Sequence, residues 1–203
     1  MRFGSRKLLY TAAISIACIL IAGTAIFLIQ TTQTTYTVKQ STASIMPSQP
    51  ERAIGIPTKL NIPAINVSAD IKLLGLTSSG NMEAPEAPLD AGWYRLGARP
   101  GNIGSAVIAG HYGESSSKIK SVFDNLETLK KGDKISILDD AGETIVFIVQ
   151  STRILPRNDD AKSVFTSNDG KAHLNLITCH GTWEQDEQTY SDRYVVYTDA
   201  ASQ

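Results

Sequence analysis

Short apolar runs separated by turn-forming residues constrain the fold of this chain more than any other feature. From residue 55 to the C-terminus, Pro, Gly, Asn and Asp repeatedly interrupt the apolar sequence, as is typical of strands joined by turns. A chain of many short strands with few helices predicts a mainly β fold and favours a closed or nearly closed β-barrel, with a β-sandwich as the alternative. The expected strands are Thr58–Ile62, Ala69–Leu74, Ser105–Ala109, Lys134–Leu138, Thr144–Gln150, Leu174–Thr178 and Arg193–Thr198.

Two local patterns add detail to this strand series. Apolar residues recur at helical spacing before Gly132, which could end a helix, so the pattern predicts one helix near residues 119–129. The sequence Asp139-Asp140-Ala141-Gly142 lies between two alternating runs and predicts a hairpin turn. The helical pattern consists of Ile119, Val122, Phe123, Leu126 and Leu129.

The N-terminal region contains a long apolar segment, Leu8 to Ile29, without a charged side chain. Its length in a helix is about 33 Å, enough to cross a hydrocarbon core of about 30 Å. Arg2, Arg6 and Lys7 precede it, so the positive charges are expected to keep the N-terminus cytoplasmic. A cleaved signal peptide is the alternative, but the apolar sequence continues through Ile29, which favours an uncleaved anchor.

These features predict four parts of the chain. Residues 1–7 form a cytoplasmic N-terminus, residues 8–29 a transmembrane helix, residues 30–54 a Thr/Ser/Gln-rich linker and residues 55–203 an extracellular domain. The expected location is therefore the cell membrane, with a single span. A net charge of −1 and the lack of a Lys/Arg-rich run in the sequence give no reason to expect a nucleic-acid partner.

The single cysteine of the predicted extracellular domain is Cys179, which ends the apolar run Asn175-Leu176-Ile177-Thr178. With no second cysteine in that domain it has no partner for an internal disulfide. A free thiol in such a domain is a candidate nucleophile. The alternative is that Cys179 is a small buried apolar residue of the core.

A cysteine nucleophile needs a base or a cationic group beside it, because the thiolate is the reactive form. His111 follows a buried-strand pattern and Gly110, so its imidazole is expected at a strand end, where it could be catalytic or could be part of a turn. Arg193 opens the next apolar run after Cys179. If the two strands pair, its guanidinium lies near the thiol and could stabilise an oxyanion. An ion pair with Asp192, Glu184 or Glu187 is the alternative role for Arg193, and we expect solvated or rim positions for the other two histidines of the chain, His173 and His180.

Strand parity indicates where a substrate could lie. Ile177 shares a strand face with Cys179, and Val195 shares a face with Arg193. We expect a groove lined by Ile177 and Val195 that binds an apolar stretch of peptide. Thr178, next to the thiol, is the third candidate substrate-binding residue.

Together these residues resemble the sortases, membrane-anchored cysteine transpeptidases of the bacterial cell surface. The family motif Thr-Leu-x-Thr-Cys is matched at Leu176, Thr178 and Cys179, with Asn175 in place of the leading threonine. The resemblance continues through Ala109-Gly110-His111 and Asp192-Arg193-Tyr194-Val195-Val196, and covers roughly residues 60–199. The compact domain is most similar to class D, E or F sortases, with class F favoured.

The resemblance implies an eight-stranded β-barrel that cleaves a C-terminal Leu-Pro-x-Thr-Gly-like sorting signal of secreted proteins. Cys179 would form a thioacyl-enzyme, His111 would act as general acid and base, and Arg193 would stabilise the oxyanion or hold the substrate. An amine of a peptidoglycan precursor or a pilin lysine would accept the acyl group. The chemistry that the resemblance implies requires no cofactor or metal. The acidic residues of the loop before the cysteine strand (Asp159, Asp160 and Asp169) are of a kind that is usually solvated, so we expect no metal site there.

Two other functions fit parts of the pattern. An L,D-transpeptidase also combines Cys, His and Arg, but its His-Gly precedes the cysteine, whereas here His180-Gly181 follows Cys179. A surface module without catalytic activity would use Cys179 only as a core residue. Selective alkylation of the thiol in the native protein would distinguish a catalytic cysteine from a core one.

Overall fold

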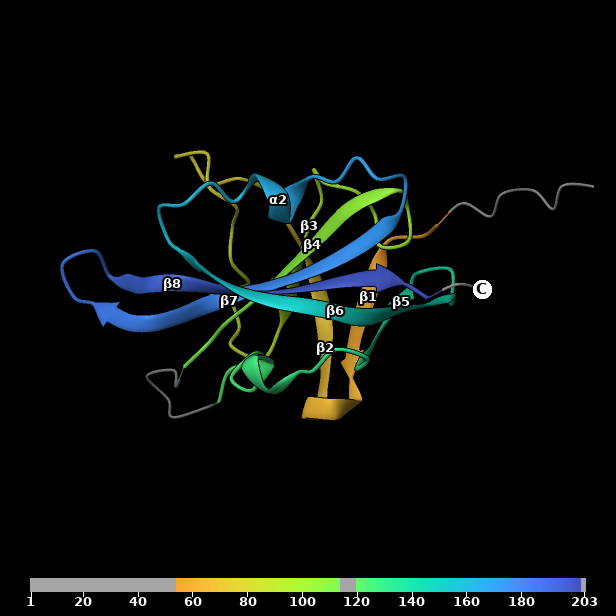
Figure 1. Cartoon of the computed structure of the whole chain (residues 1–203), viewed down its shortest axis with the longest axis horizontal. Coiled ribbons are helices and arrows are strands. Elements are labelled where there is room, and N and C mark those ends of the chain that lie inside the picture. Colours follow the sequence, from red (N-terminus) through yellow and green to blue (C-terminus); the bar gives the residue numbers. More distant parts are fainter. Residues whose placement is uncertain (1–53, 114–119, 202–203) are drawn as a thin grey trace, which may run out of the picture. The chain divides into compact units, whose positions relative to one another are not determined.

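The computed structural model describes residues 54–113 and 120–201. Eight strands form a closed barrel in the order β1-β2-β3-β4-β7-β8-β6-β5, which Figure 1 shows from the side. Its helices are short: the 3-10 turns η1 (Pro63–Ile65) and η2 (Leu126–Thr128) and the α-helix α2 (Lys162–Phe165). The strands are β1 (Pro57–Ile62), β2 (Val67–Leu74), β3 (Ala91–Tyr94), β4 (Gly104–Gly110), β5 (Lys134–Asp139), β6 (Thr144–Pro156), β7 (Ala172–Glu184) and β8 (Thr189–Ala200).

The position of β7 in the barrel decides which chain segments can meet. β7 lies between β4, with which it is parallel, and β8, with which it is antiparallel. The C-terminal ends of β4 and β7 and the N-terminal end of β8 therefore lie at one rim of the barrel. The other rim contains the β5–β6 turn, the start of β1 and the end of β8.

Alternating side chains fill the barrel. On β5, Ile135 and Ile137 are fully buried while Lys134 and Leu138 are exposed, because successive residues of a strand point to opposite faces. On β6, Phe147 and Val149 are likewise fully buried. These residues belong to one core that also includes Leu60, Ile62, Ile108, Leu174, Leu176 and Val196.

All seven expected strands are present, which confirms a mainly β fold and the closed barrel over the sandwich. β6, β7 and β8 extend well beyond their expected bounds. β3 was not expected. Its four residues include Ala91 and Gly92, which have low strand propensity, and neighbouring strands impose its conformation from both sides.

The helix expected near residues 119–129 is wrong within the described residues, where only the 3-10 turn η2 forms. The Asp124 carboxylate accepts the backbone N–H groups of Ser121 (3.0 Å) and Gly113 (2.8 Å) and ties this segment to the residues after β4. The backbone N–H groups of the segment itself bond to carbonyls three residues earlier, as in a 3-10 turn: Asp124 to Ser121 (3.2 Å), Leu126 to Phe123 (3.0 Å) and Leu129 to Leu126 (3.2 Å). The apolar residues Val122 and Phe123 are nevertheless buried. Their spacing therefore indicated which residues are buried, but not a helix. Ile119 lies outside the described residues.

The expected hairpin turn joins β5 to β6. The carboxylate of Asp139, only 4% exposed, accepts the N–H groups of Gly55, Ala141 and Glu143 at 2.8–3.0 Å. Burial alone would raise the pKa of Asp139, but these backbone donors outweigh burial and hold it below its usual range. Asp139 thus fastens the first residues of the domain to the turn.

The expected transmembrane helix at residues 8–29 lies outside the described residues, as does the expected linker up to residue 53. In the part of the chain that the structure describes, no helix has both the length and the apolar character needed to cross a membrane.

Candidate active site

Strand register brings the three candidate catalytic residues to one rim. Cys179 on β7 lies directly opposite Arg193 on β8. On the other side of β7, Ala109 pairs with Ile177, two residues before His111 and Cys179 respectively. Thr178 strengthens this alignment, since its hydroxyl donates to the Gly110 carbonyl at 2.7 Å. One side-chain hydrogen bond thus joins Thr178, the neighbour of Cys179, to Gly110, the neighbour of His111.

Cys179 is a free, partly exposed thiol. It is therefore not the fully buried core residue that the alternative interpretation required. Tyr190 is near it: burial raises the pKa of the Tyr190 hydroxyl, and the charges of Tyr112, Cys179 and Asp124 raise it further. The ring of Tyr190 also packs on Tyr112 and Trp183, with centroids 5.5 and 5.2 Å away. Trp183 and Tyr190 of the β7–β8 hairpin and Tyr112 after β4 therefore form an aromatic cluster near the thiol.

His111 is held at both its backbone and its ring. Its carbonyl accepts the N–H of Phe123 at 3.0 Å. Its Nε2 lies 2.6 Å from the carbonyl oxygen of Pro85, in the loop between β2 and β3. The imidazole is partly buried and points in a fixed direction, as a residue that exchanges protons requires.

Arg193 is held by its own strand rather than by a carboxylate. Its Nη1 donates to the carbonyls of Asp192 (2.8 Å) and Tyr190 (3.1 Å), and its Nη2 donates to the Thr189 hydroxyl (3.2 Å). No ion pair links Arg193 to an acidic side chain of the described residues. These bonds fix the guanidinium while leaving further N–H groups for a ligand.

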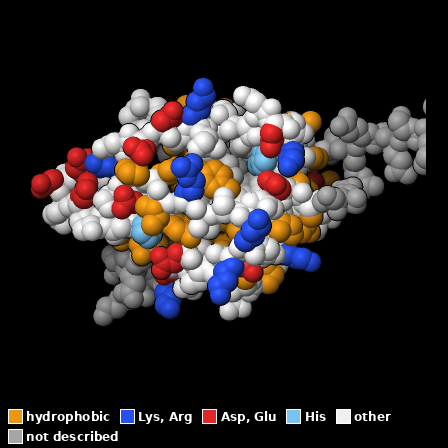
Figure 2. Space-filling view, viewed as in Figure 1, with side chains coloured by type: hydrophobic (Ala, Val, Ile, Leu, Met, Phe, Trp, Pro, Cys, Tyr) orange, Lys and Arg blue, Asp and Glu red, His pale blue; other side chains and the backbone are white. Residues whose placement is uncertain are grey.

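Two of the three acidic partners that the sequence offered to Arg193 bind another arginine, and the third, Asp192, accepts a hydrogen bond from the Ser191 hydroxyl at 2.8 Å. Glu187 and Glu184 pair with Arg157, which follows β6, at 2.6 and 3.4 Å. Acidic side chains gather over the projecting end of the β7–β8 hairpin, at the left of Figure 2. The ion pairs therefore brace this hairpin and do not neutralise Arg193.

An apolar floor adjoins Cys179. Ile177 and Val195 lie directly opposite each other on β7 and β8 and pack with Val107 of β4. Val164 of α2 covers them, and further partly buried residues complete this cluster: Met82, Tyr94, Leu155, Ala161, Phe165 and Tyr197. α2 lies above β4 and β7 in Figure 1.

The three candidate substrate-binding residues differ in accessibility. Ile177 is partly exposed and offers apolar surface next to the thiol. Val195 is fully buried within the cluster. Thr178 is only 4% exposed, and its side chain lies on the interior face of the barrel. In this structure Val195 therefore supports the floor, while the Thr178 hydroxyl aligns strands.

Sequence reasoning missed several residues that shape this site. The Pro85 carbonyl could not be found, because a main-chain group leaves no signature in residue type. Thr189 and Tyr190 lie on β8 upstream of the expected strand start, where the pattern gave no alternation. His180 does lie at the rim as expected, with its ring 5.7 Å from that of Tyr194 and its Nε2 3.5 Å from Glu127 Oε2.

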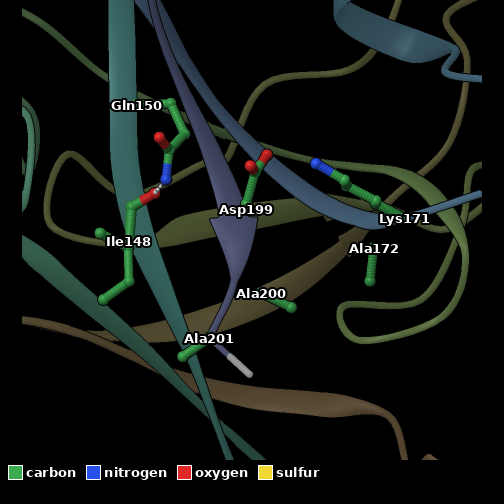
Figure 3. A pocket seen from close by; sticks show the side chains of 7 residues that line it. All are labelled: Ile148, Gln150, Lys171, Ala172, Asp199, Ala200 and Ala201. Carbon is green, nitrogen blue, oxygen red and sulfur yellow. Dashed lines mark hydrogen bonds between the residues drawn. The ribbon is translucent and has the colours of Figure 1, made fainter. Parts of the chain in front are cut away.

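His173 does not have the solvated role that the sequence suggested, but is the centre of an ion-pair group at the opposite rim. Its Nδ1 contacts Asp199 at 2.8 Å and its Nε2 contacts Asp169 at 2.9 Å. A hollow of about 520 Å³ lies beside it (Figure 3), lined by Ile148, Gln150, Lys171, Ala172, Asp199, Ala200 and Ala201. Within residues 54–113 and 120–201 no group of acidic, His or Cys side chains is arranged to hold a metal ion.

Comparisons with known proteins agree with this arrangement. No curated protein matches the chain significantly, but solved structures do. A sortase C-1 from Actinomyces oris is 25% identical, with a TM-score of 0.56 and 72% of each chain covered. A lid mutant of sortase A from Corynebacterium diphtheriae is 25% identical, with a TM-score of 0.57 over 76% of this chain and 75% of the other.

A third structure, a sortase D5 transpeptidase from Clostridium perfringens, shares the fold at 22% identity, with a TM-score of 0.53 over 72% of this chain and 79% of the other. The family profile of the sortase domain matches residues 60–201, which include every candidate catalytic residue. The chain therefore belongs to the sortase family.

Proposed function

We propose that this protein is a cysteine transpeptidase that cleaves a Leu-Pro-x-Thr-Gly-like sorting signal and transfers the acyl fragment to an amine. The observation that carries the proposal is the alignment at one rim: Cys179 lies opposite Arg193, and the Thr178–Gly110 bond sets β7 against β4, which ends one residue before His111. Membership of the sortase family supports the reaction class.

The proposed chemistry has two halves. A proton passes from the Cys179 thiol to His111, and the thiolate attacks the threonine carbonyl of the signal. Arg193 donates to the oxygen on which negative charge develops. His111 then protonates the leaving amine as the C–N bond breaks. In the second half an incoming amine gives a proton to His111 and displaces the thiolate from the thioester.

The apolar floor fits the first part of such a signal. Ile177 exposes aliphatic surface next to Cys179, while Met82 and Phe165 stand at its sides as partly buried members of the same cluster. Leucine and proline side chains would lose water against these residues, which would favour binding by about 1.5–3 kcal/mol for a buried leucine. The site therefore suits a substrate that is apolar before the cleaved bond.

The partners and location of the enzyme belong to the same proposal. Substrates would be secreted proteins with a C-terminal signal, and the acceptor would be an amine of a peptidoglycan precursor or of a pilin lysine. The apolar, uncharged segment at residues 8–29 supports an anchor that holds the enzyme at the cell membrane with its catalytic domain outside. Within the family, the compact domain supports class D, E or F, with class F favoured.

The decisive test uses the full-length protein and a fluorescence-quenched Leu-Pro-x-Thr-Gly peptide. We expect cleavage by the natural chain and by Cys18→Ala, which removes the other cysteine of the sequence, and no detectable cleavage by Cys179→Ala. Iodoacetamide should label Cys179 in the native protein. Full cleavage by Cys179→Ala would refute the thioacyl mechanism.

Transfer is tested in the same assay by adding an amine. Triglycine or a lysine peptide should yield a ligated product and should raise the turnover of the thioacyl-enzyme. If the enzyme forms a thioacyl adduct but releases only the acid at every amine concentration, the protein is a hydrolase rather than a transpeptidase.

A further inference from the structure

The contact between His111 and Pro85 constrains the proton chemistry of the site. The two groups belong to segments far apart in sequence, and the 2.6 Å separation of Nε2 and the carbonyl oxygen is shorter than the usual 2.9–3.0 Å. Pro85 is buried, so water competes little for its carbonyl.

A carbonyl oxygen can only accept a hydrogen bond. At this distance Nε2 must therefore carry a proton, both when the imidazole is neutral and when it is charged. In the neutral ring the second nitrogen, Nδ1, is then left without a proton and is the basic atom. The two nitrogens point in divergent directions, so Nδ1 is directed away from Pro85.

We infer that the Pro85 carbonyl commits Nε2 of His111 to a permanent donor role, and that Nδ1 alone exchanges protons during the reaction. The inference deepens the proposed function and rests on His111 being its acid and base. Pro85 is thus a positioning residue, which acts through the tautomer and orientation of His111.

The loop that presents Pro85 is fastened at several points. Glu83 joins it to the end of β2, since its carboxylate accepts the Gly75 N–H at 2.6 Å and its own N–H donates to the Gly75 carbonyl at 3.1 Å. After Pro85, the Pro88 carbonyl accepts the N–H of Val122 at 2.9 Å. The next residue, Phe123, holds the His111 carbonyl, so one short segment positions both partners of the contact.

The same nitrogen serves every proton transfer in the cycle. Nδ1 receives the thiol proton of Cys179 and gives it to the leaving amine when the peptide C–N bond breaks. It then takes one proton from the attacking amine, and it returns this proton to the thiolate after the thioester C–S bond breaks. Nε2–H stays on the Pro85 carbonyl throughout, and no other proton donor is needed.

Nuclear magnetic resonance of the full-length protein labelled with ¹³C and ¹⁵N tests the inference directly. With the ring neutral at alkaline pH, we expect a protonated Nε2 that exchanges slowly with water and shows a coupling through the hydrogen bond to the Pro85 carbonyl carbon. The signals of the His111 ring are identified as those that are missing from the spectrum of His111→Gln. A proton on Nδ1, or an Nε2 proton that exchanges as fast as in a free histidine, would overturn the inference.

A matched pair at Glu83 tests the consequence for catalysis. Glu83→Ala removes the acceptor for Gly75 N–H, whereas Glu83→Gln retains an oxygen there. We expect kcat of Glu83→Ala to fall by about tenfold with KM little changed, a partial loss of acid–base catalysis, and the slow Nε2 exchange to be lost. Glu83→Gln should retain both the natural kcat and the slow exchange of the Nε2 proton.

The two tests separate this inference from the proposed function. If the Nε2 signals are as expected but His111→Gln remains fully active, the tautomer is correct and the catalytic role of His111 is wrong. If Glu83→Ala loses the slow exchange without any change in kcat, the contact exists but does not serve catalysis, and the inference fails while the proposed function stands.

Discussion

At the scale of single residues, Arg193 is the group whose geometry can be tested most sharply. Its guanidinium is fixed by two main-chain carbonyls and the Thr189 hydroxyl, so a ligand meets a preorganised donor. Arg193→Lys keeps the charge but loses the planar fork. We expect kcat of Arg193→Lys to fall about 10²–10³-fold, as for loss of an oxyanion donor, measured by peptide cleavage.

Thr189 supplies the matched control for Arg193. Thr189→Val removes the acceptor for Nη2 and should lower kcat several-fold, in line with about 1 kcal/mol for one hydrogen bond. Thr189→Ser keeps the hydroxyl and should resemble the natural enzyme. Equal activity of the valine and serine variants would show that the position of the guanidinium does not depend on Thr189.

At the scale of secondary-structure elements, the hydrogen bond from Thr178 to Gly110 sets β7 against β4. Both groups are buried, so Thr178→Val leaves the Gly110 carbonyl without its side-chain donor. We expect a loss of about 1–3 kcal/mol in the free energy of unfolding, measured by urea denaturation. Thr178→Ser, which keeps the hydroxyl, should recover most of this loss.

The β7–β8 hairpin depends on a second interaction, the pairing of Arg157 with Glu187 and Glu184. The hydrogen bond and charge of Arg157 hold the pKa of Glu187 below its usual value. Because the side chains of Glu187 and Glu184 are 59% and 42% exposed, we expect Arg157→Gln to change global stability little. Proteolysis within residues 185–188 should instead become faster, as it should for the natural chain at high salt. An unchanged cleavage rate for Arg157→Gln would mean that strand pairing alone holds the hairpin.

At the scale of the whole molecule, His173 makes stability depend on pH. Burial lowers the pKa of His173, but its hydrogen bonds and charge interactions with Asp169 and Asp199 outweigh this and raise the pKa above 6.5. Asp169 remains ionised in acid, because its bond to His173 holds its pKa far below the usual range. A raised folded-state pKa stabilises the protein fully below the unfolded value of 6.5 and loses this effect as pH rises through the folded value.

We therefore expect His173→Gln to destabilise the protein more at about pH 5.5 than at about pH 9. Urea denaturation of both proteins at the two pH values measures this difference. A destabilisation of equal size at both would assign His173 a packing role only.

The fold could be predicted where the alternation of buried and exposed residues along a strand appears as a repeating pattern of apolar residues in the sequence. Alternation predicted strands such as β5, and the ordered His, Thr-Cys and Arg motifs pointed to the family. β3 was not predicted because Ala91 and Gly92 have low strand propensity. The expected helix is wrong because the N–H groups of Val122 and Phe123 bond to the distant carbonyls of Pro88 and His111, which residue spacing cannot reveal. The Pro85 carbonyl and the Thr178–Gly110 bond depend on segments that meet only in the folded barrel.

Both ends of the folded domain lie at the rim opposite the thiol. Gly55 donates to Asp139 at the β5–β6 turn, and Ala201 donates to Val146 near the start of β6. The described domain therefore begins and ends at the rim opposite Cys179, so residue 54 lies away from the rim of the candidate catalytic residues. The proximity of the two ends also means that a short connector could join them, so the chain could be reopened elsewhere as a circular permutant without disturbing the reactive groups.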